Sequence, residues 1–528
     1  MSEENNLPPP PSRAGASPAI EVYAVYGAEP EVQAYAMAKY SRSALSMKES
    51  LREINEQKAE KFLNTFYFQY GHRSIADLAH IAIAVEKLSI LAAVALVDEQ
   101  RWDGQERSTR YQDFKRGGCF APDFTGLEMC ELRYRDTIAM LMTEYEALSE
   151  SMWRYLASKT PRPADMKQEA YERTLRARAF DISRYLLPLA TNTSVGQIVN
   201  ARTLETQIAR LLSHTHPEVR HLGELLKQAA KEPAYNVNEV RYRELIEDAK
   251  AYDEIWAKQL REDILKPVRV APTLVKYAEA NPYETETRKE LRQAAVELMA
   301  AADIAQAPAV DLLDDEPLET ELATTLLYEH CHFPYRQIRE RVEALEEKRR
   351  QEIIDLGVKH RGEHDEMLRA FHAGQKFRFD ILMDIGGFRD MHRHRRCTQI
   401  GQEFTAVHGF DMPDDVRAAG VEERYTEAMQ RAAATVEHVR GELQRAGRDD
   451  AGASSQYLIP LGYRKRTLFK MDFAEAVYIA ELRTGPGGHF SYRRVAYQMY
   501  ESVARRHPAL GALIRVHDVS QPVDLLQR

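Results

Sequence analysis

Short stretches in which apolar and polar residues alternate open each half of the chain. Residues 20–26 alternate in this way and lead through Glu29-Pro30 into a stretch with helical periodicity, and residues 310–313 lead through Glu316-Pro317 into another. Alternation with a period of two is typical of a strand, and apolar residues three and four apart are typical of a helix. The pattern therefore predicts two strand-to-helix openings of the same kind.

A second pair of similar segments lies further along each half. Residues 184–189 have the sequence Arg-Tyr-Leu-Leu-Pro-Leu and residues 456–461 have the sequence Gln-Tyr-Leu-Ile-Pro-Leu, and a segment with helical periodicity follows each. Because both the openings and these later segments match, we predict a weak internal repeat with one copy in each half.

The segment between the two copies has a different composition. Residues 237–307 are rich in Glu, Lys, Arg and Ala, at helical spacing in 241–259 and 285–302. Helix-breaking prolines interrupt it at Pro267, Pro272 and Pro282. We predict a helical connector here.

Strand-like openings with long helical bodies predict an α+β fold with two repeated domains, each a β-sheet packed with long helices. A chain of 528 residues is also too long for one typical core. The predicted divisions are residues 1–18 as a disordered leader, 19–236 as the first domain, 237–307 as the connector and 308–528 as the second domain.

The charge balance limits the possible partners. A net charge of -9 argues against binding to nucleic acid or to an anionic membrane surface, so any phosphate recognition must be local. The most apolar stretch, residues 88–97, has ten uncharged residues, about half of what a membrane-spanning helix needs, and predicts a buried helix. Because the leader has no basic region followed by an apolar run, we expect a cytoplasmic protein.

The cysteines and histidines give no sign of a disulfide framework or a metal site. The four cysteines form no CxxC pair, so reduced thiols are expected. His330-Cys331-His332 and His392-x-His394 lack a second ligand pair at zinc spacing. We predict no metal.

Two motifs carry candidate phosphate chemistry. In Ser108-Thr109-Arg110-Tyr111, side chains two apart share a side of an extended segment, so a hydroxyl and a guanidinium can face one phosphate. Arg393-His394-Arg395-Arg396 packs three guanidinium forks around an imidazole, and guanidinium pairs bidentately with phosphate oxygens. Such a cluster can neutralise a pyrophosphate.

Together the two motifs resemble the signature of the flavin-dependent thymidylate synthases. That signature is Arg-His-Arg, seven residues, then Ser-x-Arg-Tyr, and it is preceded by Gly-His-x-Ser-x-x-Glu-His. The front half has Gly71-His72-Arg73-Ser74 at the matching spacing, with Asp77 and Leu78 in place of the glutamate and the second histidine.

Each half has lost the part of the signature that the other keeps. The Arg-His-Arg slot of the front half is Asp98-Glu99-Gln100, and the Ser-x-Arg-Tyr slot of the rear half is Glu403-Phe404-Thr405-Ala406. Three later family positions follow the same pattern. The front half keeps Arg184 and Asn200-Ala201-Arg202, whereas the rear half has Gln456 and Asp472-Phe473-Ala474 but keeps Leu482-Arg483.

The resemblance implies a fused pseudodimer with one composite nucleotide site per chain, and a homodimer of two-domain chains that mimics the family's tetramer. The activity that it implies is reductive methylation of dUMP to dTMP with FAD, methylenetetrahydrofolate and NADPH. The implied cofactor-binding residues are Arg393, His394, Arg395, Glu106, Ser74, Asn200 and Arg202, and the implied dUMP-binding residues are Ser108, Arg110, Arg184 and Arg483. Arg483, at the uracil edge, is also the implied catalytic residue.

The reciprocal site would pair Asp98 and Glu99 with Glu403 and Gln456. Like charges about 4 Å apart repel by roughly 4 kcal/mol at an effective dielectric near 20. We therefore predict that this second pocket does not bind polyanions. Two other functions remain open: a non-catalytic nucleotide or flavin scaffold, and one-carbon transfer to a different pyrimidine nucleotide.

Overall fold

The computed structural model describes residues 28–39, 73–115, 117–363 and 365–526. The strand expected at residues 20–26, the leader and His72 lie outside the described residues. No helix in the described ranges is long and apolar enough to cross a membrane. All four cysteines are free thiols, as expected.

Each half contains one antiparallel sheet. The front sheet has the order β1-β3-β2, built from β1 (His80–Ser89), β3 (Asn192–Asn200) and β2 (Asp103–Glu106). The rear sheet has the order β4-β5-β7-β6, built from β4 (Val310–Leu312), β5 (Phe377–Asp384), β7 (Arg464–Met471) and β6 (Thr398–Gly401). The order β1-β3-β2 repeats as β5-β7-β6, which confirms the α+β fold with two repeated domains.

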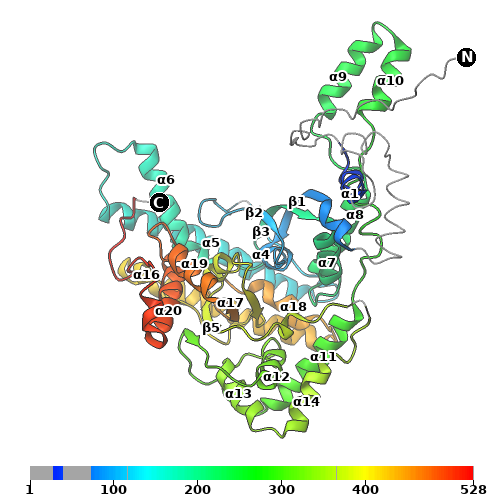
Figure 1. Ribbon diagram of the computed structural model, residues 1–528. Coiled ribbons are helices and arrows are strands. Elements are labelled where there is room, and N and C mark those ends of the chain that lie inside the picture. Colours follow the sequence, from blue (N-terminus) through cyan, green and yellow to red (C-terminus); the bar gives the residue numbers. More distant parts are fainter. Residues whose placement is uncertain (1–27, 40–72, 116, 364, 527–528) are drawn as a thin grey trace, which may run out of the picture.

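Helices make up most of the remaining structure (Figure 1). The front half contains α1 (Pro30–Lys39), η2 (Arg73–Leu78), α4 (Ile90–Leu96), α5 (Glu128–Lys159), α6 (Gln168–Ser183), η3 (Arg184–Leu186), α7 (Ala201–Leu212) and α8 (Pro217–Lys231). The connector contains α9 (Glu239–Lys250), α10 (Glu254–Ile264) and α11 (Pro282–Leu298). The rear half contains α12 (Leu318–Tyr328), α13 (Tyr335–Glu343), α14 (Glu347–Leu356), η4 (Arg369–Phe371), α15 (Ile385–Met391), α16 (Asp414–Ala418), α17 (Glu422–Arg445), α18 (Ala451–Ser455), η5 (Gln456–Leu458), α19 (Phe473–Arg483), α20 (Phe490–Arg506) and α21 (Pro508–Gly511).

The connector is helical, but two helices, α9 and α10, lie where the sequence predicted one at 241–259. The side chain of Asp253 accepts hydrogen bonds from the backbone N–H groups of Ile255 and Trp256, so it caps a new helix inside the predicted stretch 241–259. α9 and α10 form a hairpin that stands out from the rest of the chain (Figure 1). The predicted buried helix at 88–97 is α4, which starts at Ile90 because the two preceding residues belong to β1.

The same helix caps recur in the two halves. Ser89 caps α4 and Asp384 caps α15, each by accepting a hydrogen bond from the backbone N–H three residues later. Asn200 caps α7 and Asp472 caps α19 in the same way. An N-cap needs only a short side chain with an oxygen acceptor, so Ser, Asn and Asp serve equally well at these positions.

The two closing segments of the repeat meet each other in space. The backbone N–H of Leu189 donates to the carbonyl of Ile459, and the N–H of Leu461 donates to the carbonyl of Leu187, both at 2.9 Å. The same exchange joins Ala190 to Tyr457 and Gly462 to Tyr185. Such reciprocal contacts between equivalent residues are the mark of a two-fold interface, here within one chain.

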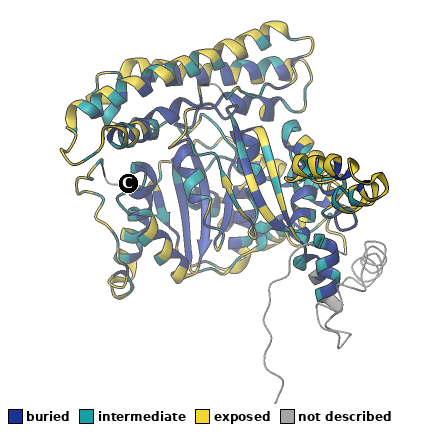
Figure 2. Ribbon diagram, turned by 90° about the horizontal axis from the view of Figure 1, so that it is seen from above, coloured by how far each residue is buried: buried dark blue, intermediate teal, exposed yellow. Residues whose placement is uncertain are grey.

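The two sheets differ in how far they are covered (Figure 2). Exposed residues alternate with buried ones along β1 and β3, so one face of the front sheet is open. The strands β5 and β7 are buried at nearly every position. On one face of the rear sheet, Phe379 and Ile381 pack in the same apolar cluster as Val495 of α20. On the other face, Leu468 packs in the same cluster as Leu326 of α12.

Candidate functional site

Four arginines, two from each half, act electrostatically on the carboxylate of Asp390 in α15. The guanidinium of Arg184, from η3, lies 3.5 Å from this carboxylate. Burial alone would raise the pKa of Asp390, but Arg184, Arg110, Arg393 and Arg483 outweigh it and hold that pKa below its ordinary value. The structure thus brings the motif arginines of both halves to one place, which we call the arginine cluster.

Arg110 follows β2 and is buried in this cluster. Its Nε donates to Asp181 at 2.6 Å, its Nη2 to the same carboxylate at 3.2 Å, and its Nη1 to the hydroxyl of Tyr492 at 3.0 Å. Burial would lower the pKa of Arg110, but Asp181 outweighs it and the pKa is raised. Because Tyr492 belongs to α20, a front-half arginine is fixed by the rear half.

Arg483 and His394 form a hydrogen-bonded pair at the rear of the cluster. The Nε of Arg483 donates to Nε2 of His394 at 2.7 Å, which assigns the ring proton to Nδ1, 3.4 Å from Glu475. Burial lowers the pKa of His394 despite Glu475, so the ring is neutral at pH 7. The Tyr492 ring is shared, since its centroid lies 5.4 Å from the guanidinium carbon of Arg483 and 5.6 Å from that of Arg110.

The two arginines after His394 have different surroundings. The guanidinium of Arg395 lies 4.4 Å from the centroid of the Trp102 ring, and burial together with Arg393 lowers its pKa. The side chain of Arg396 is 68% exposed and lies 3.4 Å from Asp472. Arg395 therefore belongs to the contact between the halves, and Arg396 faces solvent.

Glu106 and Ser108 contribute to the same contact. Glu106 accepts a hydrogen bond from Arg389 of α15, which also donates to the hydroxyl of Thr109 at 3.3 Å. The hydroxyl of Ser108 accepts from the backbone N–H of Arg110 at 3.2 Å, so it shapes the turn that carries this arginine.

The remaining predicted flavin residues lie elsewhere. Asn200 caps α7, and Arg202 lies 3.4 Å from Asp77 and 3.6 Å from Glu366. Ser74 is in η2, and its side chain is not among the described ones. Arg202 does not belong to the arginine cluster; it lines a cavity at the predicted reciprocal site, which we call the second cavity.

The second cavity has a volume of about 920 Å³ and lies between α7, α11 and the rear sheet. All four residues predicted for the reciprocal site line it: Asp98, Glu99, Glu403 and Gln456. The acids do not face one another unscreened as the sequence suggested. Each is paired with an arginine outside the signature: Asp98 with Arg369 at 2.6 Å, Glu99 with Arg210 at 2.8 Å, and Glu403 with Arg292.

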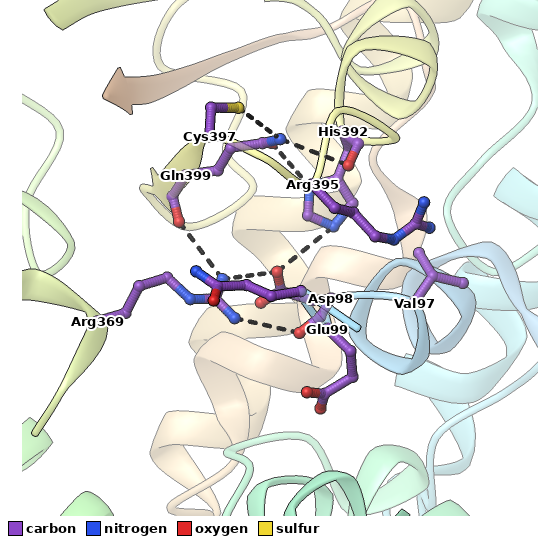
Figure 3. Close-up of a pocket in the computed structure, with 9 residues that line it drawn as sticks. Val97, Asp98, Glu99, Arg369, His392, Arg395, Cys397 and Gln399 are labelled. Carbon is purple, nitrogen blue, oxygen red and sulfur yellow. Dashed lines mark hydrogen bonds and ion pairs between the residues drawn. The ribbon is translucent and has the colours of Figure 1, made fainter. Parts of the chain in front are cut away.

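Asp98 lines both the second cavity and a small pocket beside the basic motif of the rear half. Figure 3 shows it between Arg369 and His392, with Arg395 beside them, around a small pocket of about 20 Å³. Burial would raise the pKa of Asp98, but Arg369 and His392 outweigh it, and the pKa lies well below its ordinary value. The carboxylate is therefore ionised at neutral pH.

Sequence reasoning missed Asp181, Arg389, Asp390 and Tyr492, because none of them stands in a signature slot. Asp390 had one usable signal, since it lies three residues before Arg393 and therefore close to it. Asp181 and Tyr492 are 71 and 382 residues from Arg110 along the chain, and no local pattern joins them.

Comparison with known proteins gives a consistent picture. The family model described as "Thymidylate synthase complementing protein" matches residues 24–234 and 312–509. A "UPF0159 protein" of Chlamydia pneumoniae is 26% identical, over 96% of this chain and 93% of its own length. Another, of Thermoplasma acidophilum, is 24% identical over 91% and 94%. A flavin-dependent thymidylate synthase of Clostridium tetani is 24% identical over 40% of this chain and 82% of its own.

Among solved structures, a flavin-dependent thymidylate synthase of Helicobacter pylori complexed with FAD and dUMP is 16% identical, covers 38% of this chain and 89% of its own, and gives a TM-score of 0.23. The matches to the family model span well over half of the chain, in two separate regions that correspond to the two halves described above. The chain therefore belongs to the thymidylate synthase complementing protein family, that of the flavin-dependent thymidylate synthases, as a form in which the family sequence occurs twice.

Proposed function

We propose that the protein is an FAD-dependent thymidylate synthase that converts dUMP to dTMP, with one composite site per chain at the arginine cluster. The observation that carries this proposal is the convergence of Arg110 and Arg184 with Arg393 and Arg483 around Asp390. A nucleotide phosphate needs several cations in one place, and here neither half supplies them alone.

Buried donors in the arginine cluster and at the neighbouring Arg395 support an anionic ligand. The Nε atoms of Arg184 and Arg395 are buried and have no hydrogen-bond partner among the described residues. Gly386 lies against Arg184, since a Cβ on this glycine would stand 3.3 Å from that Nε. An unpaired buried donor costs about 1–3 kcal/mol of stability. An acceptor atom of FAD or dUMP would supply the missing hydrogen bond.

In this proposal Arg393 and Arg395 hold the FAD beside His394, and Ser108, Arg110 and Arg184 hold the dUMP. When bound, reduced FAD supplies the hydride, methylenetetrahydrofolate the carbon unit and NADPH the electrons for the flavin. Arg483 faces the uracil and stabilises the negative charge that makes carbon 5 nucleophilic. Neutral His394 orients the guanidinium of Arg483 by accepting its Nε–H. A cytoplasmic homodimer of two-domain chains belongs to the same proposal.

A flavin titration tests the composite site. We expect the purified protein to be yellow, or to become so with added FAD, and to saturate at one FAD for each 528-residue chain. The physical reason lies in the second cavity, which has Asp98 and Glu99 at the positions that correspond to Arg393 and His394. These carboxylates are paired with arginines and offer no cation to a second FAD. Two flavins per chain, measured by absorbance of the bound fraction, would contradict the proposal, as would a colourless protein that cannot be reconstituted.

Neighbouring arginines give a matched pair of variants. Arg395→Ala is expected to abolish flavin retention because it removes a half-buried guanidinium at the contact between the halves. Arg396→Ala removes a guanidinium that is 68% exposed and should change flavin retention little. The flavin absorbance of the two variants after gel filtration gives the answer, and equal retention by both would remove Arg395 from the flavin site.

A non-catalytic nucleotide scaffold is the second candidate function. It is favoured by Asp77, Leu78 and Asp472, which stand where the family signature has a glutamate, a histidine and an asparagine. One-carbon transfer to another pyrimidine nucleotide uses the same cluster. Calorimetry with dUMP, dCMP and UMP separates the pyrimidine substrates, since the enzyme as proposed requires dUMP to bind most tightly. The flavin absorbance separates the enzyme from the scaffold, because a colourless protein that cannot be reconstituted with FAD favours the scaffold.

A further inference from the structure

The second cavity contains a buried lysine that the proposed function does not use. Lys465, in β7, is 7% exposed and lines this cavity. Its ammonium donates to the carbonyl of Gln402, and it lies 4.2 Å from the centroid of the Phe404 ring and 5.2 Å from that of Phe388. Within the described residues no carboxylate lies within 4 Å of it. A lysine has three donors, so two remain for another acceptor.

Further polar groups beside Lys465 lack partners. The hydroxyl of Thr467 and the side-chain oxygen of Gln402 are buried and have no hydrogen-bond partner in the described part of the chain. Thr467 lies two residues after Lys465 on the same strand, so both point to the same face of the sheet. Both also line the cavity, as Gln402 does. The ammonium, with two of its three donors left, thus lies at one end of the cavity together with an unpaired acceptor and an unpaired hydroxyl.

A glycine keeps the approach to the ammonium open. Gly401 pairs with Thr467 across the strands β6 and β7. A Cβ at this position would stand 3.1 Å from both Cε and Nζ of Lys465. Any larger residue here would press on the lysine and narrow this end of the cavity.

The charges of the cavity favour a ligand with a single negative charge. Three of the lining arginines are already matched by carboxylates, in the pairs Arg369–Asp98, Arg210–Glu99 and Arg292–Glu403. A polyanion would extend to those three carboxylates, whereas a single carboxylate or sulfonate needs only the ammonium of Lys465, on which Glu403, Asp98 and Glu329 act from beyond salt-bridge distance. The rings of Phe388 and Phe404 beside the ammonium favour an aromatic body, and about 920 Å³ is ample for a small metabolite.

We propose that the second cavity is a separate binding site for a small aromatic monoanion, whose negative group is held by Lys465 between Phe388 and Phe404. The cavity occupies the place of the lost reciprocal site, so loss of the nucleotide motif left a pocket with different chemistry. The site touches the arginine cluster through α15, because Phe388 lines the cavity and Asp390, two residues on, lies among the four arginines.

Three probes of one shape test the charge requirement on the full-length protein. They are 2-naphthoate, the neutral 2-naphthamide and the dianion 2,6-naphthalenedicarboxylate, with binding measured by calorimetry. We expect 2-naphthoate to bind at least about tenfold more tightly than the amide, because a charge-assisted hydrogen bond is lost in the amide. The dianion should bind more weakly than 2-naphthoate. Equal binding of 2-naphthoate and the amide would overturn the proposal.

Variants tie the binding to this cavity. Lys465→Met should lower the affinity for 2-naphthoate at least about tenfold and abolish the preference over the amide, whereas Lys376→Met, at a lysine side chain that is 74% exposed, should change neither. If Lys465→Met does not fold, Gly401→Ala decides, because its added methyl group narrows the site and should weaken 2-naphthoate binding. Unchanged affinity in the folded variant would overturn the proposal.

Competition separates this site from the arginine cluster. Saturating dUMP should leave 2-naphthoate binding in place, because the two ligands occupy different pockets. Displacement of the probe by dUMP would overturn the proposal. If dUMP does not bind at all, the proposed enzymatic function fails, while the naphthoate series still decides the second site.

Discussion

Replacing Arg483 with alanine is expected to lower the rate of dUMP methylation by about 100- to 1,000-fold, which corresponds to roughly 3–4 kcal/mol of lost transition-state stabilisation. The guanidinium is held by its hydrogen bond to neutral His394 and by the ring of Tyr492, so it reaches the ligand already oriented. It acts on charge that builds up on the pyrimidine during the reaction and only weakly on the resting substrate. Single-turnover kinetics with reduced enzyme measure the step directly.

Binding measurements show whether this loss belongs to catalysis. Arg483→Ala should retain FAD, because the flavin is assigned to Arg393 and Arg395. Arg494→Ala, at an exposed arginine of α20, should behave as wild type in every assay. Unchanged single-turnover kinetics in Arg483→Ala would remove this residue from the mechanism, and a variant without flavin would give it a structural role instead.

The sequence predicted the repeat because both halves keep residues that fix the local backbone geometry. A Pro-Leu pair preceded by an aliphatic residue ends each closing segment, as Leu-Pro-Leu in the front half and Ile-Pro-Leu in the rear half. Asn200 and Asp472 cap equivalent helices, so these residues serve the same backbone geometry twice. The reciprocal hydrogen bonds between the closing segments could not be predicted. They join backbone groups about 270 residues apart, and backbone groups leave no mark in the sequence.

The sequence predicted the arginines of the candidate site but not the carboxylates that lie among them. Spacing within the signature identified Arg110, Arg184, Arg393 and Arg483, which the structure gathers around one carboxylate. That carboxylate, Asp390, and the Asp181 partner of Arg110 have no fixed place in the signature. The charge balance of the second cavity could not be predicted for the same reason, because the signature identified its acids but not the arginines on η4, α7 and α11 that pair with them.

Acidification from pH 7.5 to 5.0 is expected to lower the free energy of unfolding by about 2 kcal/mol through His216 alone. Burial lowers the pKa of His216 to about 4, and its ring packs edge-on against Tyr457 with its Nδ1 3.3 Å from that of His214. Between pH 6.5 and 4, His216 binds a proton in the unfolded chain but not in the folded protein. The free energy of unfolding therefore falls as the pH falls. Burial also holds the pKa of His214 well below its ordinary value, which adds to the loss.

Urea denaturation at the two pH values measures this loss, and two variants locate it. His216→Gln should make stability less dependent on pH, because the titrating ring is gone. His221→Gln, at a side chain that is 66% exposed, should keep the wild-type dependence. The carboxylates with lowered pKa, Asp98 and Asp390, lose their contribution only below about pH 4, so they do not interfere in this window. The same pH dependence in His216→Gln and in the wild-type protein would mean that His216 takes up a proton in the folded state and that its ring is open to water.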